Sequence, residues 1–424
     1  MSLLMMALWV ACQPAAGSGQ PSVPSVADTL PPAPEPVLPG AAVLLRDSLH
    51  LLDGRRIGLV ANHTSLIGRT HLADTLLARG VQVVRVFSPE HGFRGQADAG
   101  EAVANATDAR TGLPVVSLYG NNKKPTAAQL AGLDLVIFDL QDVGTRHYTY
   151  ISTMAYVMEA CAEQGISMLV LDRPNPNGGY VEGPVMETAY TSFIGMHRAP
   201  IVHGMTIGEY ARMVNGEKWL KSGVQARLTV IPCQAYTHAM TWAATGLPWV
   251  PPSPNLGTPY AAYLYPALCW LEPTPVSVGR GTHDAFTIVG APWLVPPEAA
   301  RQAGHQAWYG LTGTVYTFTP VSIPGKSKTP PFQDQVCTGY RFSGEPDGPA
   351  LMQAGLALLT ELYQGHKRAG VRGDFFGKNF ATWAGNTRLQ AQIVQGQTPE
   401  EIWQSWQPGV EAFKNIRSRY LLYP

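Results

Sequence analysis

Residues 135–172, LVIFDLQDVGTRHYTYISTMAYVMEACAEQGISMLVLD, decide the fold class of this chain. Two short and almost continuous apolar runs, 135–139 and 168–172, flank a segment whose apolar residues recur every three or four positions from Ile151 to Met158. Such runs are typical of strands buried on both faces of a parallel sheet, and the periodic segment is typical of an amphipathic helix. We therefore predict a strand–helix–strand unit with a right-handed crossover.

Similar apolar runs at 56–62, 81–87 and 115–119 precede this unit. Their alternation with helical segments predicts an α/β fold that begins with a Rossmann-like doubly wound parallel sheet domain. Gly165, directly after the periodic segment, is expected to end its helix.

The proline-rich stretch 249–259 suits neither a helix nor a strand, so we place a domain boundary there. Beyond it, strand candidates at 286–289, 315–318 and 336–342 mix with helices such as 350–363 and predict a smaller α/β domain. Thr398 and Pro399 are expected to cap and open the last helix. The expected parts are a signal segment (1–12), a Pro/Ser-rich tether (13–40), the Rossmann-like domain (41–258) and the smaller domain (259–424).

The amino terminus resembles a bacterial lipoprotein signal. An apolar run at 3–10, too short to span a bilayer, is followed by the small residue Ala11 and by Cys12. No Lys or Arg precedes the run, and Trp9 is unusual there. An ordinary export signal and an accidental resemblance are the alternatives. We expect an exported lipoprotein that is held at the membrane only through a lipid on Cys12.

The charge balance argues against nucleic acid as a partner. Lys and Arg together number 30, equal to Asp and Glu, and charged residues make up only 14% of the 424 residues. The five cysteines form no CxxC pair and no Cys/His cluster with metal-ligand spacing, so we expect neither a structural metal nor a cofactor.

Polar side chains follow four of the predicted strands, and parallel strands present their carboxyl ends at one edge of a sheet, where ligands bind. The most informative end is Glu90, because the run 81–87 stops at Pro89 and delivers a carboxylate and His91 at once. A simple turn through Pro89 and Gly92 is the alternative. The other ends carry Asn62, Asp139 with Asp142, and Asp172 with Asn175.

The segment 139–148 places two carboxylates, Arg146 and Tyr148 between a buried strand and the start of a helix. A helix amino terminus favours anions, and Arg146 has the forked geometry that binds a carboxylate. Arg146 would instead be structural if it neutralised Asp142.

Three loop residues add to these candidates. Glu182 and Arg280 are surrounded by glycines, and His203 precedes a helix. The chain has no GxSxG elbow, no Walker loop, no HExxH and no GxGxxG after its first strand, so nucleotide-dependent chemistry is poorly supported despite the expected fold.

Several long segments together resemble the NamZ-type exo-β-N-acetylmuramidases, formerly a domain of unknown function. The segments that carry this resemblance are SPEHGFRG (88–95), FDLQDVGTRHYTY (138–150), LDRPNP (171–176), PPSPN (251–255) and GRGT (279–282). The resemblance implies release of terminal N-acetylmuramic acid from the non-reducing end of peptidoglycan fragments, such as muropeptides or disaccharides. It also implies an active site in the cleft between the two domains, with the catalytic glutamate of the family at Glu90.

Glycoside hydrolysis needs a proton donor at the leaving oxygen and a second group that stabilises the positive ring carbon. Glu90 is the candidate donor, and the second group is a carboxylate or the 2-acetamido group of the substrate itself. The candidate second carboxylates are Asp139, Asp142 and Glu182. The candidate cations for the lactyl carboxylate are Arg94, Arg146 and Arg280, and the remaining substrate-binding candidates are Asn62, His91, Tyr148, Asn175 and His203.

Two alternatives remain open. The first is a non-catalytic lipoprotein that binds cell-wall sugars in the same cleft. The second is a metal-dependent hydrolase that uses Asp139, Asp142 and His203, which have suitable side chains but no helical spacing to support it.

Overall fold

The computed structural model describes residues 35–90, 92–94 and 106–424. The predicted signal segment with Cys12, most of the predicted tether, and His91 lie outside the described residues. Residues Pro36–Pro424 form one compact unit. The domain boundary that the sequence predicts at residue 258 therefore remains a prediction. In the described part of the chain, no helix is both long and apolar enough to cross a membrane.

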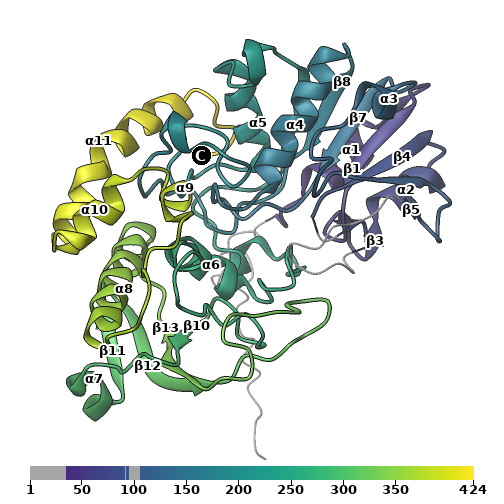
Figure 1. The fold of residues 1–424 in the computed structure, drawn as a ribbon. Helices are drawn as coiled ribbons and strands as arrows, with labels where there is room; N and C mark the ends of the chain where they lie inside the picture. The colour runs from purple at the N-terminus through teal and green to yellow at the C-terminus, as the bar shows by residue number, and fades with distance from the viewer. Residues whose placement is uncertain (1–34, 91, 95–105) are drawn as a thin grey trace, which may run out of the picture. The chain divides into compact units, whose positions relative to one another are not determined.

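The large sheet has seven strands in the order β5-β6-β4-β1-β7-β8-β9 (Figure 1). All neighbouring pairs are parallel except β5 with β6. Without β5, this is the strand order of a Rossmann fold, so the predicted doubly wound sheet is confirmed. The strands are β1 (Ile57–Ala61), β4 (Val83–Ser88), β5 (Ala106–Thr107), β6 (Pro114–Ser117), β7 (Leu135–Asp139), β8 (Ser167–Leu171) and β9 (Arg227–Ile231).

Helices cover both faces of this sheet because its central strands are apolar on both sides. Leu59 and Ala61 of β1 pack with helices α1 and α2, whereas Val60, between them, packs with α4 and α5. Side chains alternate across a strand, so a continuous apolar run needs two covering layers. The helices of this part are α1 (Gly40–Asp47), α2 (Leu72–Ala78), α3 (Ala127–Leu130), α4 (Tyr150–Glu163) and α5 (Ile207–Gly216).

The sequence did not reveal the two outermost strands. β9 lies at one edge, and its side chains alternate between exposed and partly buried, so it lacks the apolar run that marks the central strands. β5 is only two residues long and is exposed. The helix between β7 and β8 ends as predicted, with Gly165 at a φ of 64° just beyond it.

A smaller antiparallel sheet in the order β10-β13-β12-β11 forms the second part, as predicted. Helix α8 packs against this sheet and against α6, and their buried residues join the core on one face of the large sheet. The elements are α6 (Pro259–Leu268), β10 (Ile288–Ala291), α7 (Glu298–Ala303), β11 (His305–Trp308), β12 (Leu311–Phe318), β13 (Cys337–Ser343) and α8 (Gly348–Arg368).

The chain ends in three helices, α9 (Phe380–Ala384), α10 (Arg388–Val394) and α11 (Pro399–Arg417). The Thr398 side chain accepts a hydrogen bond from the Glu401 N–H, and Pro399 opens α11, as predicted. Short elements complete the described chain: β2 (Leu66–Ile67), β3 (Thr70–His71), and the 3₁₀ helices η2 (Leu49–Leu52), η3 (Thr188–Tyr190), η4 (Lys221–Gly223), η5 (Ala243–Thr245) and η6 (Cys269–Leu271).

Candidate active site

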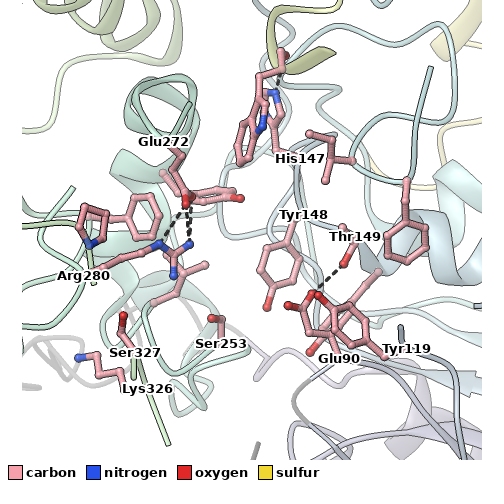
Figure 2. A pocket seen from close by; sticks show the side chains of 18 of the residues that line it. Glu90, Tyr119, His147, Tyr148, Thr149, Ser253, Glu272, Arg280, Lys326 and Ser327 are labelled. Carbon is pink, nitrogen blue, oxygen red and sulfur yellow. Dashed lines mark hydrogen bonds and ion pairs between the residues drawn. The ribbon is translucent and has the colours of Figure 1, made fainter. Parts of the chain in front are cut away.

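A pocket of about 610 Å³ lies beyond the carboxyl ends of β4 and β6 (Figure 2). Glu90 and Tyr119, each two residues after a strand, contribute to one wall together with residues 147–150 at the start of α4. The other lining residues are Phe193, Ile194, Ser253, Leu256, Tyr265, Glu272, Arg280, Phe286, Lys326, Ser327, Lys328, Thr329, Pro331 and Trp383.

Glu90 is half-buried and is surrounded by hydroxyl groups. Thr149 Oγ1 donates a hydrogen bond to Glu90 Oε2 at 3.3 Å, and this hydroxyl is available because it does not cap α4. Burial, followed by the charge of Glu90 and a hydrogen bond to it, raises the pKa of Tyr119. Thr149 directly precedes α4, so the start of this helix lies on the same side of the pocket. A carboxylate is thus held at the pocket wall in a defined orientation.

Glu272 and Arg280 form an ion pair on the opposite side of the pocket (Figure 2). The Nε and Nη2 atoms of Arg280 donate to the two carboxylate oxygens of Glu272, each at 3.0 Å. The guanidinium also lies over the ring of Phe286, 5.1 Å from its centroid. This bidentate geometry occupies both oxygens of Glu272 and directs Arg280 into the pocket.

The proline-rich stretch 249–259 contributes Ser253 and Leu256 to the pocket lining and is hydrogen-bonded to residues on both sides of it in the sequence. Tyr150 donates through its hydroxyl to the carbonyl of Pro252 at 3.0 Å and accepts from Asn62 Nδ2 at 2.7 Å. Asn255 Nδ2 donates to the carbonyl of Lys326 at 2.9 Å. Asn62 is fully buried and therefore orients Tyr150 and this stretch rather than facing the pocket.

The other strand ends are closed by buried polar contacts. Asp139 accepts hydrogen bonds from Arg173 Nε at 2.6 Å and Nη2 at 2.9 Å. Asp172 accepts from the Thr206 and Tyr423 hydroxyls at 2.7 and 2.6 Å and from the Gly208 N–H at 2.8 Å. Of the four strand ends that the sequence singled out, only the one carrying Glu90 lines the pocket.

None of the three predicted second carboxylates lines the pocket, which corrects that expectation. Asp139 is bound by Arg173, and Asp142 is buried with its Oδ2 accepting from the Gly144 N–H at 2.8 Å. Glu182 is buried and accepts from Trp406 Nε1 at 3.1 Å. Burial raises the pKa of Asp142 to about 7 and also raises that of Glu182. The second carboxylate of the lining is Glu272, which the sequence reasoning missed.

Arg146 is fully buried and bonded to main chain, which corrects its predicted role at the substrate. Its two Nη atoms donate to four carbonyls: Pro184 (2.5 Å), Ala199 (3.0 Å), Trp383 (3.0 Å) and Ala384 (2.6 Å). Burial lowers the pKa of Arg146 to about 10, so it stays charged at neutral pH. It does not pair with Asp142 either.

Arg94 also lies away from the pocket. It pairs with Asp108 at 2.8 Å and with Asp74 at 3.3 Å. Of the three predicted cations, Arg280 is therefore the one that lines the pocket.

The remaining predicted residues divide between the pocket and its support. Tyr148 lines the pocket and is 8% exposed. Asn175 is buried and bonded to the carbonyl groups of Gly178 and Met205. His203 is fully buried, and burial lowers its pKa to about 3, so it is neutral.

A metal site at the predicted triad finds no support in this geometry. His203 Nε2 lies 3.9 Å from Asp142 Oδ2, but Asp139 is occupied by Arg173. Within the described residues, no group of three His, Cys, Asp or Glu side chains is arranged to hold a metal ion.

Several lining residues carried no sequence signal. Glu272 directly follows Trp270 and Leu271, in a segment that reads as core. Lys326 stands in the long connection between β12 and β13, and Trp383 lies far along the chain on α9. No spacing rule links these positions, because they meet only when the two sheets and the carboxyl-terminal helices pack together.

Comparison with known proteins identifies relatives along most of the chain. The family description "exo-beta-N-acetylmuramidase NamZ, N-terminal" matches residues 57–260, and its C-terminal counterpart matches residues 263–423. A Bacillus subtilis (strain 168) protein named peptidoglycan beta-N-acetylmuramidase NamZ is 38% identical over 389 residues, which are 91% of each chain.

Two crystal structures of DUF1343 family proteins from Bacteroides fragilis NCTC 9343 are also similar. One has a TM-score of 0.78 at 39% sequence identity, and the other has a TM-score of 0.82 at 30% identity. Each comparison covers 92% of this chain and 99% of the other.

Replacement of Arg146 by lysine should destabilise the protein. The carbonyls of Pro184 and Ala384 have no second donor among the described residues, and each buried acceptor left without a donor costs about 1–3 kcal/mol. A lysine ammonium cannot reproduce the forked geometry that reaches both, so we expect Arg146→Lys to lose roughly 2–6 kcal/mol in urea unfolding. Arg388→Lys, at an exposed pair with Glu187, should lose about 0–1 kcal/mol. If Arg146→Lys lost activity without losing stability, the original hypothesis that Arg146 binds the substrate would be favoured.

Replacement of Asp142 by asparagine should stabilise the protein at high pH. The folded protein keeps the Asp142 proton to about pH 7, whereas the ordinary carboxyl pKa is 3.8. The unfolded chain therefore ionises first, and stability falls as pH rises between these values. Asp142→Asn keeps the acceptor for Gly144 and should melt above wild type at pH 8, by a margin that shrinks toward pH 4. A lower melting temperature at pH 8, or an activity loss beyond about 100-fold, would show that the ionised carboxylate is needed.

Proposed function

The chain belongs to the NamZ family of exo-β-N-acetylmuramidases, and from this we propose that Glu90 is its general acid in the release of N-acetylmuramic acid from non-reducing ends. It is a glycosidase that acts on peptidoglycan. Its substrates are peptidoglycan-derived muropeptides or disaccharides, and nucleic acid has no part in this proposal.

The position of Glu90 carries the proposal. The described lining contains two carboxylates, and Glu272 is held by Arg280 through both of its oxygens. Both oxygens of Glu272 are therefore already bonded within the protein, whereas an acid must be able to reach the glycosidic oxygen. Glu90 lies across the pocket, among hydroxyl groups and beside the start of α4. A proton on Glu90 would pass to the glycosidic oxygen as the bond to the ring carbon breaks.

The second catalytic group is then the 2-acetamido group of the substrate. Asp139, Asp142 and Glu182 lie outside the lining, and Glu272 is occupied by Arg280. The carbonyl oxygen of the acetamido group can attack the ring carbon from within the substrate, as in other substrate-assisted glycosidases. This role needs no further carboxylate from the protein.

Replacement of Glu90 by glutamine should remove most of the activity without unfolding the protein. A positioned acid contributes about 10²- to 10⁴-fold, so kcat on a chromogenic β-N-acetylmuramic acid glycoside should fall by at least that factor. Glu187→Gln, an exposed control, should keep wild-type kcat. Activity of Glu90→Gln within a few-fold of wild type would refute the assignment.

The same assay separates the two alternative functions. A non-catalytic sugar-binding protein would not turn over the glycoside at all. A metal-dependent hydrolase would turn it over but would lose activity with a chelator. We expect turnover that a chelator leaves unchanged.

We propose in addition that Cys12 anchors the mature protein to a membrane. The short apolar run, the small residue Ala11 and the Pro/Ser-rich stretch that follows support this assignment. One acyl chain binds a membrane only marginally, so a stable anchor needs several chains on this cysteine.

Replacement of Cys12 by serine should therefore move the protein from the membrane fraction to the soluble fraction. Hydrolysis should be unchanged, because residues 13–35 lie between Cys12 and the compact unit that begins at Pro36. A native protein that is soluble in the cytoplasm and retains Met1 would refute the anchor.

A further inference from the structure

Arg280 alone does not explain how the pocket would attract an anionic substrate. Glu272 neutralises Arg280 through two hydrogen bonds. Burial lowers the pKa of His147 to about 3, so it carries no charge at neutral pH. The described lining also contains Lys326 and Lys328, both in the connection between β12 and β13.

These two lysines differ in their surroundings. Lys328 is exposed, where water and salt screen its charge. Lys326 is partly buried, and burial lowers its pKa. In the described part of the chain, no carboxylate lies within ion-pair distance of Lys326. Asp284 acts on it electrostatically, but the same carboxylate binds Arg341 at 2.7 Å.

The main chain of Lys326 is held in place on three sides. Its carbonyl accepts from Asn255 Nδ2 at 2.9 Å, and its N–H donates to the carbonyl of Ile323 at 3.1 Å. Ile323 and Ser327 exchange two main-chain hydrogen bonds that close a tight turn around it. The ammonium thus extends from a fixed backbone and not from a free loop.

The same connection packs against the turn that carries Arg280. The Val321 N–H donates to the carbonyl of Gly281 at 2.9 Å. A Cβ atom on Gly281 would lie 2.5 Å from Pro330, and its φ of 82° is itself a conformation suited to glycine. Lys326 and Arg280 therefore share one side of the pocket, and Glu90 lies on the other (Figure 2).

We propose that Lys326 supplies the net positive charge that selects the lactyl carboxylate of N-acetylmuramic acid, with Arg280 beside it as an oriented hydrogen-bond donor. The Nη1 group of Arg280 has no protein acceptor among the described residues and is available to the same carboxylate. Glu272 aligns Arg280 but opposes its attraction for an anion, so the neighbouring uncompensated ammonium decides whether an acid or a neutral sugar is preferred. This assignment rests on the proposed muramidase function and concerns fragments with a free lactyl acid, because a muropeptide carries its peptide on that group as an amide.

The test compares two chromogenic glycosides that differ only in charge. One carries the free lactyl acid of β-N-acetylmuramic acid, and the other carries its neutral lactyl amide. Lys326→Met keeps most of the side-chain length without the charge. It should lower kcat/KM on the acid by about 10- to 100-fold, mainly through KM, with little change on the amide. Lys326→Arg should restore most of the preference.

Lys414→Met is the matched control, because Lys414 is an exposed lysine on α11 that pairs with Glu411 outside the pocket. Added salt should raise KM for the acid in the wild type and less so in Lys326→Met. Equal losses on acid and amide, or an unchanged preference, would overturn the role of Lys326. Failure of the wild type to cleave either glycoside would instead overturn the proposed function.

Discussion

The candidate site depends on the hydrogen bonds that the Arg146 guanidinium donates to four main-chain carbonyls. This guanidinium is fully buried and joins the carbonyls of Pro184 and Ala199, in loops beyond the large sheet, to those of Trp383 and Ala384 near the end of the chain. Buried carbonyls that lack a donor are costly, and the carbonyls of Pro184 and Ala384 have no second donor among the described residues. The bonded cation makes their meeting favourable and thereby places Trp383 at the pocket.

The neighbouring His147 extends this connection. Its Nε2 bonds the carbonyl of Trp383 at 2.7 Å, and its ring stacks on the indole with centroids 5.1 Å apart. His147 also lines the pocket, directly before Tyr148 and Thr149, and Thr149 bonds Glu90. A continuous set of contacts therefore runs from the buried arginine to the proposed acid. Arg146 lies outside the lining but supports the pocket wall that carries the proposed acid.

The sheet edge explains why only one of the four strand ends lines the candidate active site. Doubly wound sheets collect polar side chains at the carboxyl ends of their strands, and a buried charge there must be compensated. Arg173 compensates Asp139, and hydroxyl and amide donors surround Asp172. Glu90 follows the strand next to β1, away from these networks. The pocket forms where this end faces the second part of the chain.

Sequence alone determined the central strands of the large sheet, the helix between β7 and β8, the smaller second part, the family resemblance and the position of Glu90. These features arise from local periodicity, turn residues and contiguous motifs, which a sequence displays directly. The tertiary structure decided which polar residues face the pocket. Arg146 and Asp142 have charged side chains of the kind found in active sites, but both are buried away from the pocket. Glu272 and Lys326 line the pocket although no local sequence pattern marks them. Burial and charge compensation depend on neighbours that are distant in the chain, so no local pattern encodes them.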